Sequence, residues 1–387
     1  MLTLTGLLPI FYDALDVVSR ELIGFIPAVS RDSSAARAAV GDVVQSPVVG
    51  TMPAEDVTPS AYAATPPAQT IDNVQMTIQK SRGVPFGITG EGTLSLRNAG
   101  TFQQINRDRI VNAMRVLTNE MEADIAKLHI EASRAVGANN IVPFGTPGDF
   151  MDFANPNMVL DDNGSPTSDR HMVLGSTAIA NIRGKQSGLF NLNTSGTDEL
   201  LRRGIIGDVE GLSIHNSAQT MKNVTVGAGA GARTIVAIHA EEATTINLDT
   251  AGSGTILDGD IITFAGDSNQ YVVVSGTPDV NLGGMITIAE PGLQQAIPAV
   301  ATSITVIPAA TRNMFFHRSA IQLATRTPAM PEGGDSADDF ILITDPVSGL
   351  TYEFLVYRQK RQVRYEVNIA WGVKMIAPRH CGLLIGA

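Results

Sequence analysis

Residues 201–219, LRRGIIGDVEGLSIHNSAQ, contain the residue types of a phosphate-binding loop beside a candidate catalytic base. Gly204, Gly207 and Gly211 follow two arginines and precede His215. A phosphate loop needs Lys and Ser or Thr after its glycines, and a helix whose N–H groups face the phosphate. This stretch has neither, because LSIHNS has the character of a strand. We therefore interpret the glycines as a bend between packed strands, and His215 as structural, since no orienting carboxylate or nucleophile can be assigned to it.

Other patterns that resemble reactive or metal-binding motifs also lack the context that such chemistry needs. VGAGAGAR (226–233) has Gly at alternate positions instead of GxGxxG, and a strand-like stretch follows it, so we interpret it as a flexible hinge. The six histidines form no zinc-binding pattern. Asp335, Asp338 and Asp339 lack the spacing of an EF-hand and indicate a solvated acidic loop that faces a basic patch on a neighbour. The sequence predicts no catalytic residue, cofactor or metal.

One basic cluster stands out, RQKRQVR at 358–364. On a single strand Arg358, Lys360 and Arg364 would share one face, and Arg361 would lie on the other. Three interpretations remain open: a patch that faces DNA phosphates, salt bridges across a subunit interface, or an exposed strand face.

Composition narrows the class of protein. The chain has 387 residues, of which 44% are hydrophobic and 17% charged, as expected for two or three folded domains. The net charge of −11 argues against a dedicated nucleic-acid binder. The single cysteine, Cys381, predicts a reducing compartment. The N-terminus lacks a basic n-region, and no run of eighteen apolar residues occurs, so we expect a soluble cytoplasmic product without membrane contact.

The first hundred residues predict a helical arm followed by an extended hairpin. In residues 1–36, apolar side chains recur at helical spacing. They are Phe11, Leu15, Val18 and Leu22. In residues 37–100, Val74, Met76 and Ile78 alternate with polar residues, as on a strand with one buried face, and a proline-rich stretch precedes them. A two-stranded ribbon is marginal alone, so it must lie on something else.

Residues 101–137 predict one long helix. No Pro or Gly occurs between Thr101, which with Gln104 fits a capping box, and Gly137. Its apolar stripe is Ile110, Met114, Leu117, Met121, Ile125 and Leu128. Such a helix would be about 50 Å long at 1.5 Å per residue. We expect the helix and the hairpin to leave apolar surface that only other copies can cover.

The remaining residues predict a mixed domain interrupted by a β-rich block. Residues 138–222 contain a strand at 171–175 and a helix with Ser176 as N-cap. Residues 223–311 are short strands with Arg233 as the only Lys or Arg against eight Asp or Glu, which favours an independent β-barrel or sandwich. Residues 312–387 resume the mixed pattern, so the fold class is α+β with an inserted all-β domain.

This order of parts resembles tailed-phage major capsid proteins with the Hong Kong 97-type fold. The stretches that carry the resemblance are RRGIIGDVEG, NMFFHRSAIQLATR and YEFLVYRQKRQVRYEVNIAWGVKMIAP. The block with LDGDIITFAG, YVVVSG and MITIAEPGL resembles the insertion domain of podovirus coat proteins of the Salmonella-phage type. The resemblance implies an N-terminal arm (1–36), an E-loop hairpin with peripheral-domain strands (37–100) and a peripheral-domain spine helix (101–137). It further implies an axial domain in two halves (138–222 and 312–387, the second half including peripheral-domain strands) around the insertion (223–311).

The function implied is a non-enzymatic subunit that self-assembles, as hexamers and pentamers, into an icosahedral shell around phage double-stranded DNA. The expected partners are further copies, a scaffolding protein, a portal and a decoration protein, with weak non-specific contact to DNA. The expected location is the virion, after assembly in the host bacterial cytoplasm. Two alternatives remain: the shell of an encapsulin-like nanocompartment, and a carbohydrate-active protein. The second is disfavoured because only Phe264 and Tyr271 are aromatic within 223–311.

Some shells of this fold are cross-linked by an isopeptide bond between Lys and Asn. Lys80, near the hairpin, and Asn368 of the next subunit are the candidate pair. We disfavour the reaction because no buried Glu can be assigned as its base.

Overall fold

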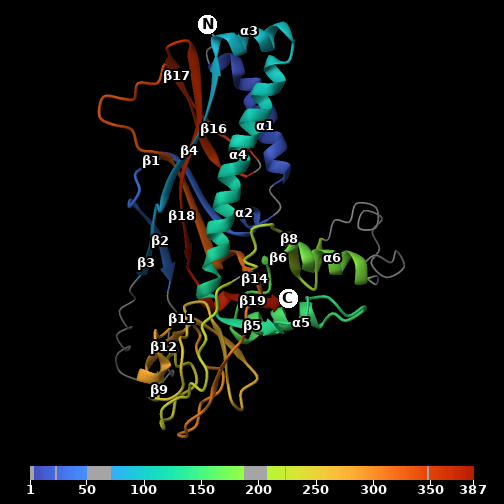
Figure 1. Cartoon of the computed structure of the whole chain (residues 1–387), viewed down its shortest axis with the longest axis vertical. Helices are drawn as coiled ribbons and strands as arrows, with labels where there is room; N and C mark the ends of the chain where they lie inside the picture. The colour runs from blue at the N-terminus through green and yellow to red at the C-terminus, as the bar shows by residue number, and fades with distance from the viewer. Residues whose placement is uncertain (1–3, 22–23, 50–70, 187–206, 223, 347) are drawn as a thin grey trace, which may run out of the picture.

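The structure of the chain is a computed structural model that describes residues 4–21, 24–49, 71–186, 207–222, 224–346 and 348–387. The molecule is elongated, with a six-stranded sheet and helix α4 in one half and an eleven-stranded sheet reaching the other end (Figure 1). Among the described residues no helix is both long and apolar enough to cross a membrane.

The six-stranded sheet is built from both ends of the chain. Its order is β1-β15-β18-β17-β16, and β4 also pairs with β18. The strands are β1 (Ser30–Ala38), β4 (Lys80–Thr89), β15 (Ile321–Pro328), β16 (Asp339–Thr344), β17 (Thr351–Gln359) and β18 (Gln362–Met375). Strand β1 runs parallel to β15, although most of its sequence, SRDSSAARA, falls within the predicted arm of residues 1–36. Pairing with β15 and the ion pair from Arg326 to Asp32, 2.8 Å, override the low strand propensity of this stretch.

Helix α4 (Phe102–Ala126) lies on this sheet and is covered by α1 (Leu8–Glu21). The predicted stripe is buried from Ile110 to Ile125, and Leu128 is half-buried. Phe11, Leu15 and Val18 of α1 belong to the same hydrophobic core; Leu22 lies outside the described residues. The prediction that the helix needs another copy to cover its apolar surface is therefore wrong.

The long helix is also shorter than predicted. It ends at Ala126, a 3-10 turn η2 follows at Lys127–Glu131, and Arg134–Gly137 forms strand β5. Strand β5 pairs with two other strands, so tertiary pairing overrides the helical pattern of the sequence. The predicted capping box is absent, because the side chain of Thr101 makes no cap hydrogen bond. Residues expected as strand form α3 (Gly90–Asn98), whose first turn is capped when Gly92 N–H donates to Thr89 Oγ1.

Strands β2 (Val43–Val49) and β3 (Ile71–Thr77) form a two-stranded antiparallel ribbon, paired from Val43 with Thr77 to Val49 with Ile71. The proline-rich residues 50–70 lie outside the described residues. At the base of the ribbon a small apolar cluster contacts the six-stranded sheet. Its buried members are Ala38, Met76, Ile78, Ala324 and Ala370.

Helices α5 (Met151–Asp162) and α6 (Ser176–Lys185) pack on the eleven-stranded sheet. The short helix α2 (Phe25–Ala28) lies near it and contacts β6. In its central part, strands from distant segments pair in the order β5-β19-β14-β6-β8-β7. These strands are β6 (Arg170–Leu174), β7 (Asp208–Val209), β8 (Leu212–Asn216), β14 (Thr311–His317) and β19 (Cys381–Gly386). Helix α6 begins at Ser176, but Gly175 is its N-cap and makes no side-chain cap bond, so the predicted Ser cap is wrong.

Residues 224–311 close into a small barrel. Its named strands are β9 (Thr245–Leu248), β10 (Ile261–Phe264), β11 (Gln270–Ser275), β12 (Gly284–Ile288) and β13 (Ile304–Val306). They pair as β9-β12-β11-β10-β13, and residues 232–239 join β9 to residues 297–304 to complete the ring. Its buried core, from Ala232 to Ile304, comes entirely from the block. Strand β11 also pairs with β5, so the barrel shares a sheet with the body and is not independent.

Candidate functional site

The described part of the glycine-rich stretch LRRGIIGDVEGLSIHNSAQ contains a β-hairpin. Strands β7 and β8 are joined by Glu210 and Gly211, with φ of 50° and 78°. Positive φ at the second turn residue explains the glycine. Gly204 and both arginines lie outside the described residues. No phosphate-binding helix follows the turn.

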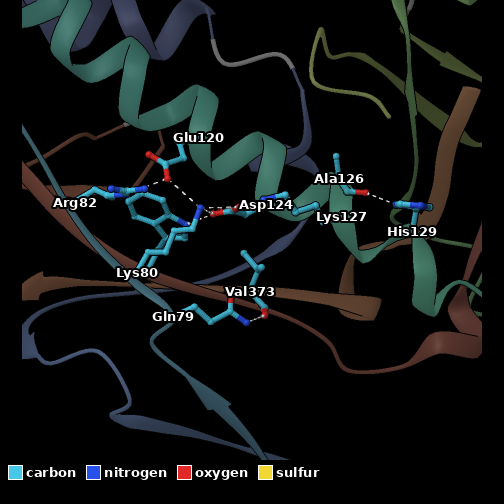
Figure 2. Close-up of polar contacts among 10 residues, drawn as sticks. Gln79, Lys80, Arg82, Glu120, Asp124, Ala126, Lys127, His129 and Val373 are labelled. Atoms are coloured by element: carbon cyan, nitrogen blue, oxygen red, sulfur yellow. Dashed lines mark hydrogen bonds and ion pairs between the residues drawn. The ribbon is translucent and has the colours of Figure 1, made fainter. Parts of the chain in front are cut away.

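Lys80 is the centre of a polar network that joins β4, α4 and β18 (Figure 2). Its Nζ lies 2.9 Å from Glu120 Oε1 and 2.8 Å from Asp124 Oδ2. Asp124 also accepts a hydrogen bond from the indole N–H of buried Trp371, 3.0 Å, and pairs with Lys127 at 2.9 Å. The network therefore fixes the strand that follows the β2–β3 ribbon against the helix.

The protonation of this network follows from its contacts. Burial lowers the pKa of Lys80, but Asp124 and Glu120 outweigh it and the pKa is raised. Burial raises the pKa of Asp124, but Lys80, Lys127 and Trp371 lower it overall. Both groups are thus held in their charged forms. An isopeptide bond needs a neutral amine, so this geometry favours a structural Lys80 over the Lys80–Asn368 cross-link.

A buried Glu of the kind that a cross-link would require is present, but it serves another purpose. Glu122 accepts hydrogen bonds from Ile26 N–H, 2.8 Å, and Ser217 Oγ, 2.7 Å, and burial raises its pKa despite them. It lines a pocket of about 280 Å³. On an α-helix, residues two apart differ by about 200°, so Glu122 points away from Lys80 and its partners Glu120 and Asp124. It ties the N-terminus of α2 to α4.

The basic cluster is a hairpin turn and not one strand, so the predicted arrangement of its faces is wrong. Strands β17 and β18 are joined by Lys360 and Arg361, and Arg361 has φ of 59°. Arg358 and Arg364 lie on opposite strands. All four side chains are exposed, and Arg364 pairs with Glu366. Sequence reasoning missed the turn because it contains neither Gly nor Asn.

The acidic loop before β16 is bound to its own chain. Tyr357 donates its hydroxyl hydrogen to Asp335, and the backbone N–H of Arg358 donates to Asp338 Oδ2, 2.6 Å. Asp339 Oδ2 accepts from Leu4 N–H, 2.8 Å. These contacts fold the loop onto β17, while Asp335 and Asp338 stay exposed, as predicted for a solvated loop. Contact of this loop with a basic patch on a neighbour stays a prediction.

His215 lies beside His171, with its Nε2 3.0 Å from His171 Nδ1. Arg318 Nη2 lies 3.2 Å from the other ring nitrogen of His171. Burial lowers the pKa of His171 to about 4, with His215 and Arg318 acting in the same direction and Asp169 and Asp208 opposing. No group of three or more His, Cys, Asp or Glu in the described residues is placed to hold a metal.

Because His171 titrates at about 4 in the folded chain and at about 6.5 when unfolded, it destabilises the fold as pH falls through that window. We expect the free energy of unfolding of the native chain to fall relative to that of His171→Phe between pH 6.5 and 4. Urea unfolding of both proteins at several pH values measures this difference. The raised pKa values of Glu122 and Asp260 affect the pH dependence of stability equally in both proteins. If the free energies of unfolding of the two proteins change with pH in parallel, the prediction is wrong.

Sequence reasoning also missed two buried residues of opposite charge, Arg312 and Asp260, at the neck of the barrel, where the chain leaves the block. They interact electrostatically without a direct hydrogen bond between their side chains. Arg312 is 1% exposed, and none of its three side-chain nitrogens has a hydrogen-bond partner among the described residues. Asp260 is fully buried and accepts from Leu257 N–H, 2.7 Å, and Gly227 N–H, 3.1 Å. Burial lowers the pKa of Arg312 to about 10, with Asp260 opposing, and raises that of Asp260.

Comparison with known proteins gives structural likenesses only. No protein-family model matches the chain, and no curated protein does. Among solved structures, one from Mycobacterium phage Che8 is 13% identical with a TM-score of 0.43, covering 89% of this chain and 84% of the other. The capsid structure of cyanophage P-SCSP1u is 10% identical (TM-score 0.46, 93% and 86% covered). A virus-like particle from Pyrococcus furiosus is 8% identical (TM-score 0.44, 97% and 98% covered). Sequence identity is too low in each case to transfer function.

Proposed function

We propose that this chain is a tailed-phage major capsid protein that self-assembles into the icosahedral shell around a double-stranded DNA genome. The observation that carries the proposal is the β2–β3 ribbon, which pairs with neither main sheet. Val43 is exposed, whereas Met76 is buried in the apolar cluster at the base of the ribbon. Because a two-stranded ribbon is marginal alone, it is suited to lie on a neighbouring subunit.

A second feature supports the same role. Strand β16 is an edge of the six-stranded sheet, and Phe340 and Leu342 on it are 55% and 37% exposed. An unpaired sheet edge with exposed apolar side chains promotes aggregation, and a closed assembly can cover it. The Lys80 network fixes β4, the strand that follows the ribbon, against α4 and so sets the direction in which the ribbon extends toward a neighbouring subunit.

The finer assignments belong to the same proposal. The chain forms hexamers and pentamers, with a scaffolding protein, a portal and a decoration protein as partners, and resides in the virion after assembly in the host cytoplasm. The exposed cations at 358–364 face a neighbouring subunit or, weakly, the packaged DNA. The ribbon is the E-loop, α4 the spine helix of the peripheral domain, and the barrel an insertion in the axial domain.

Electron microscopy of the purified full-length chain tests the proposal. We expect uniform closed shells or capsomers, alone or with scaffolding protein from the same gene cluster. Nucleic acid inside shells isolated from producing cells separates a virus from a nanocompartment, which would hold a cargo protein. A chain that stays monomeric at every concentration, with scaffolding protein present, would sink the proposal.

A further inference from the structure

The barrel carries an exposed apolar surface at its outer end. Residues 233–239 run antiparallel to residues 297–303, with bridges between Arg233 and Ser303 and between His239 and Ile297. This register places Val236 opposite Val300, and they are 71% and 56% exposed. Ile238 beside them is 72% exposed. Clustered exposed apolar side chains of this kind mark interaction sites.

This apolar ribbon of residues 233–239 and 297–303 has acidic neighbours. The only Lys or Arg of the block, Arg233, is paired with Asp249 at 2.9 Å. Glu241 and Glu242, which follow the ribbon, are exposed. A second barrel docked here would bring like charges together. The occupant that fits is apolar at its centre and basic at its rim.

The chain itself presents such a surface, at the other end of its long axis (Figure 1). The β17–β18 turn exposes Arg358, Lys360 and Arg361. The turn is tied to α3, because Gly90 N–H donates to Arg361 O, 2.9 Å. Leu94, one helical turn after Gly90 on the same face, is 62% exposed. Turn and helix together expose one large apolar side chain, Leu94, and the three cations of the turn beside a single carboxylate, Glu91, so this end is basic on balance.

We propose that this basic end of one copy docks on the apolar ribbon and acidic rim of the barrel of a second copy. In Figure 1, α3 and β17 lie at one end of the molecule and β9 and β12 at the other, so the two surfaces cannot meet within one chain. The contact is head-to-tail, the type that closes into rings when its rotation allows. The inference rests on the proposed self-assembly and names one of its contacts.

Charge reversal on the full-length chain tests the docking. Lys360→Glu with Arg361→Glu removes the basic rim, and Glu241→Lys with Glu242→Lys removes the acidic one. We expect each pair alone to raise the concentration needed for association about tenfold or more, and all four together to restore it to within about threefold. Sedimentation velocity over a series of protein and NaCl concentrations gives these values, and NaCl should weaken association of the native chain.

Matched controls change the same charges elsewhere. Lys185→Glu on α6 and Glu332→Lys in the loop before β16 are at exposed positions and should leave association unchanged. Ile238→Ser should weaken association without changing its salt dependence, because it removes only apolar contact. Circular dichroism and thermal unfolding establish that each variant folds.

The outcomes separate this contact from the proposed function. Shells that form equally well with every reversal would overturn the docking and leave the capsid role standing. Weakening by each single pair without recovery in the combination would also overturn it, because the two rims would then have different partners. A native chain that never associates would overturn both.

Discussion

Asp124→Ala is expected to lower the free energy of unfolding by about 3 kcal/mol, since it leaves a buried donor unpaired and removes one of the two carboxylates that pair with the partly buried Lys80. The carboxylate that it removes accepts from the indole N–H of Trp371 and pairs with Lys80 and Lys127. Lys80 retains Glu120, which limits the loss. Trp371 is the only tryptophan of the chain and is fully buried, so its fluorescence reports urea unfolding directly.

Asp108→Ala is the matched control, because Asp108 lies on the same helix but is exposed. Its replacement should change stability by no more than about 0.5 kcal/mol. Equal midpoints for the two variants would show that the network around Lys80 contributes nothing to the fold, and the structural role assigned to it would be wrong.

Arg312→Ala is the second substitution with a large expected effect, about 3 kcal/mol or more of lost stability. The change opens a cavity where a long side chain was fully buried and leaves the Asp260 carboxylate without its cation. Arg312→Met fills much of the volume and removes a guanidinium whose nitrogens lack hydrogen-bond partners among the described residues. We expect the Met variant to lie within about 1 kcal/mol of the native chain.

Chemical unfolding of the three proteins at pH 7 distinguishes volume from charge. A Met variant as unstable as the Ala variant would show that the positive charge beside Asp260 matters more than packing. That result would contradict our expectation that the volume of the Arg312 side chain, more than its charge, stabilises the fold.

Much of the architecture could be predicted from periodicity. Helical spacing of Phe11, Leu15 and Val18, and of Ile110 through Ile125, identifies two helical faces that the structure buries. Alternation at Val74 and Met76 identifies β3. The bend at the glycine-rich stretch could also be predicted, because the stretch lacks the Lys and the following helix that a phosphate loop needs. These signals depend only on residues close together in the sequence, so they can be interpreted without knowing which distant segments pack against them.

What escaped prediction depends on contacts distant in the sequence. The helical pattern continues past Ala126, yet Arg134–Gly137 pairs with β11 and β19, which the sequence cannot place. The turn at Lys360 and Arg361 carries no Gly or Asn. The buried Arg312 and Asp260 look like surface residues in the sequence, because burial of a charge is decided by the fold alone.

Strand β18 receives β4, β15 and β17, and it ends at Met375 of a 387-residue chain. During synthesis α4 emerges long before this strand, and Trp371 joins Asp124 across 247 residues. Helix α1 precedes α4 and can pack on it early, but the side of α4 that faces β18 lacks this strand until late in synthesis. Loop closure over such spans is slow. We therefore expect chains that stall before residue 362 to aggregate more readily than the full-length chain.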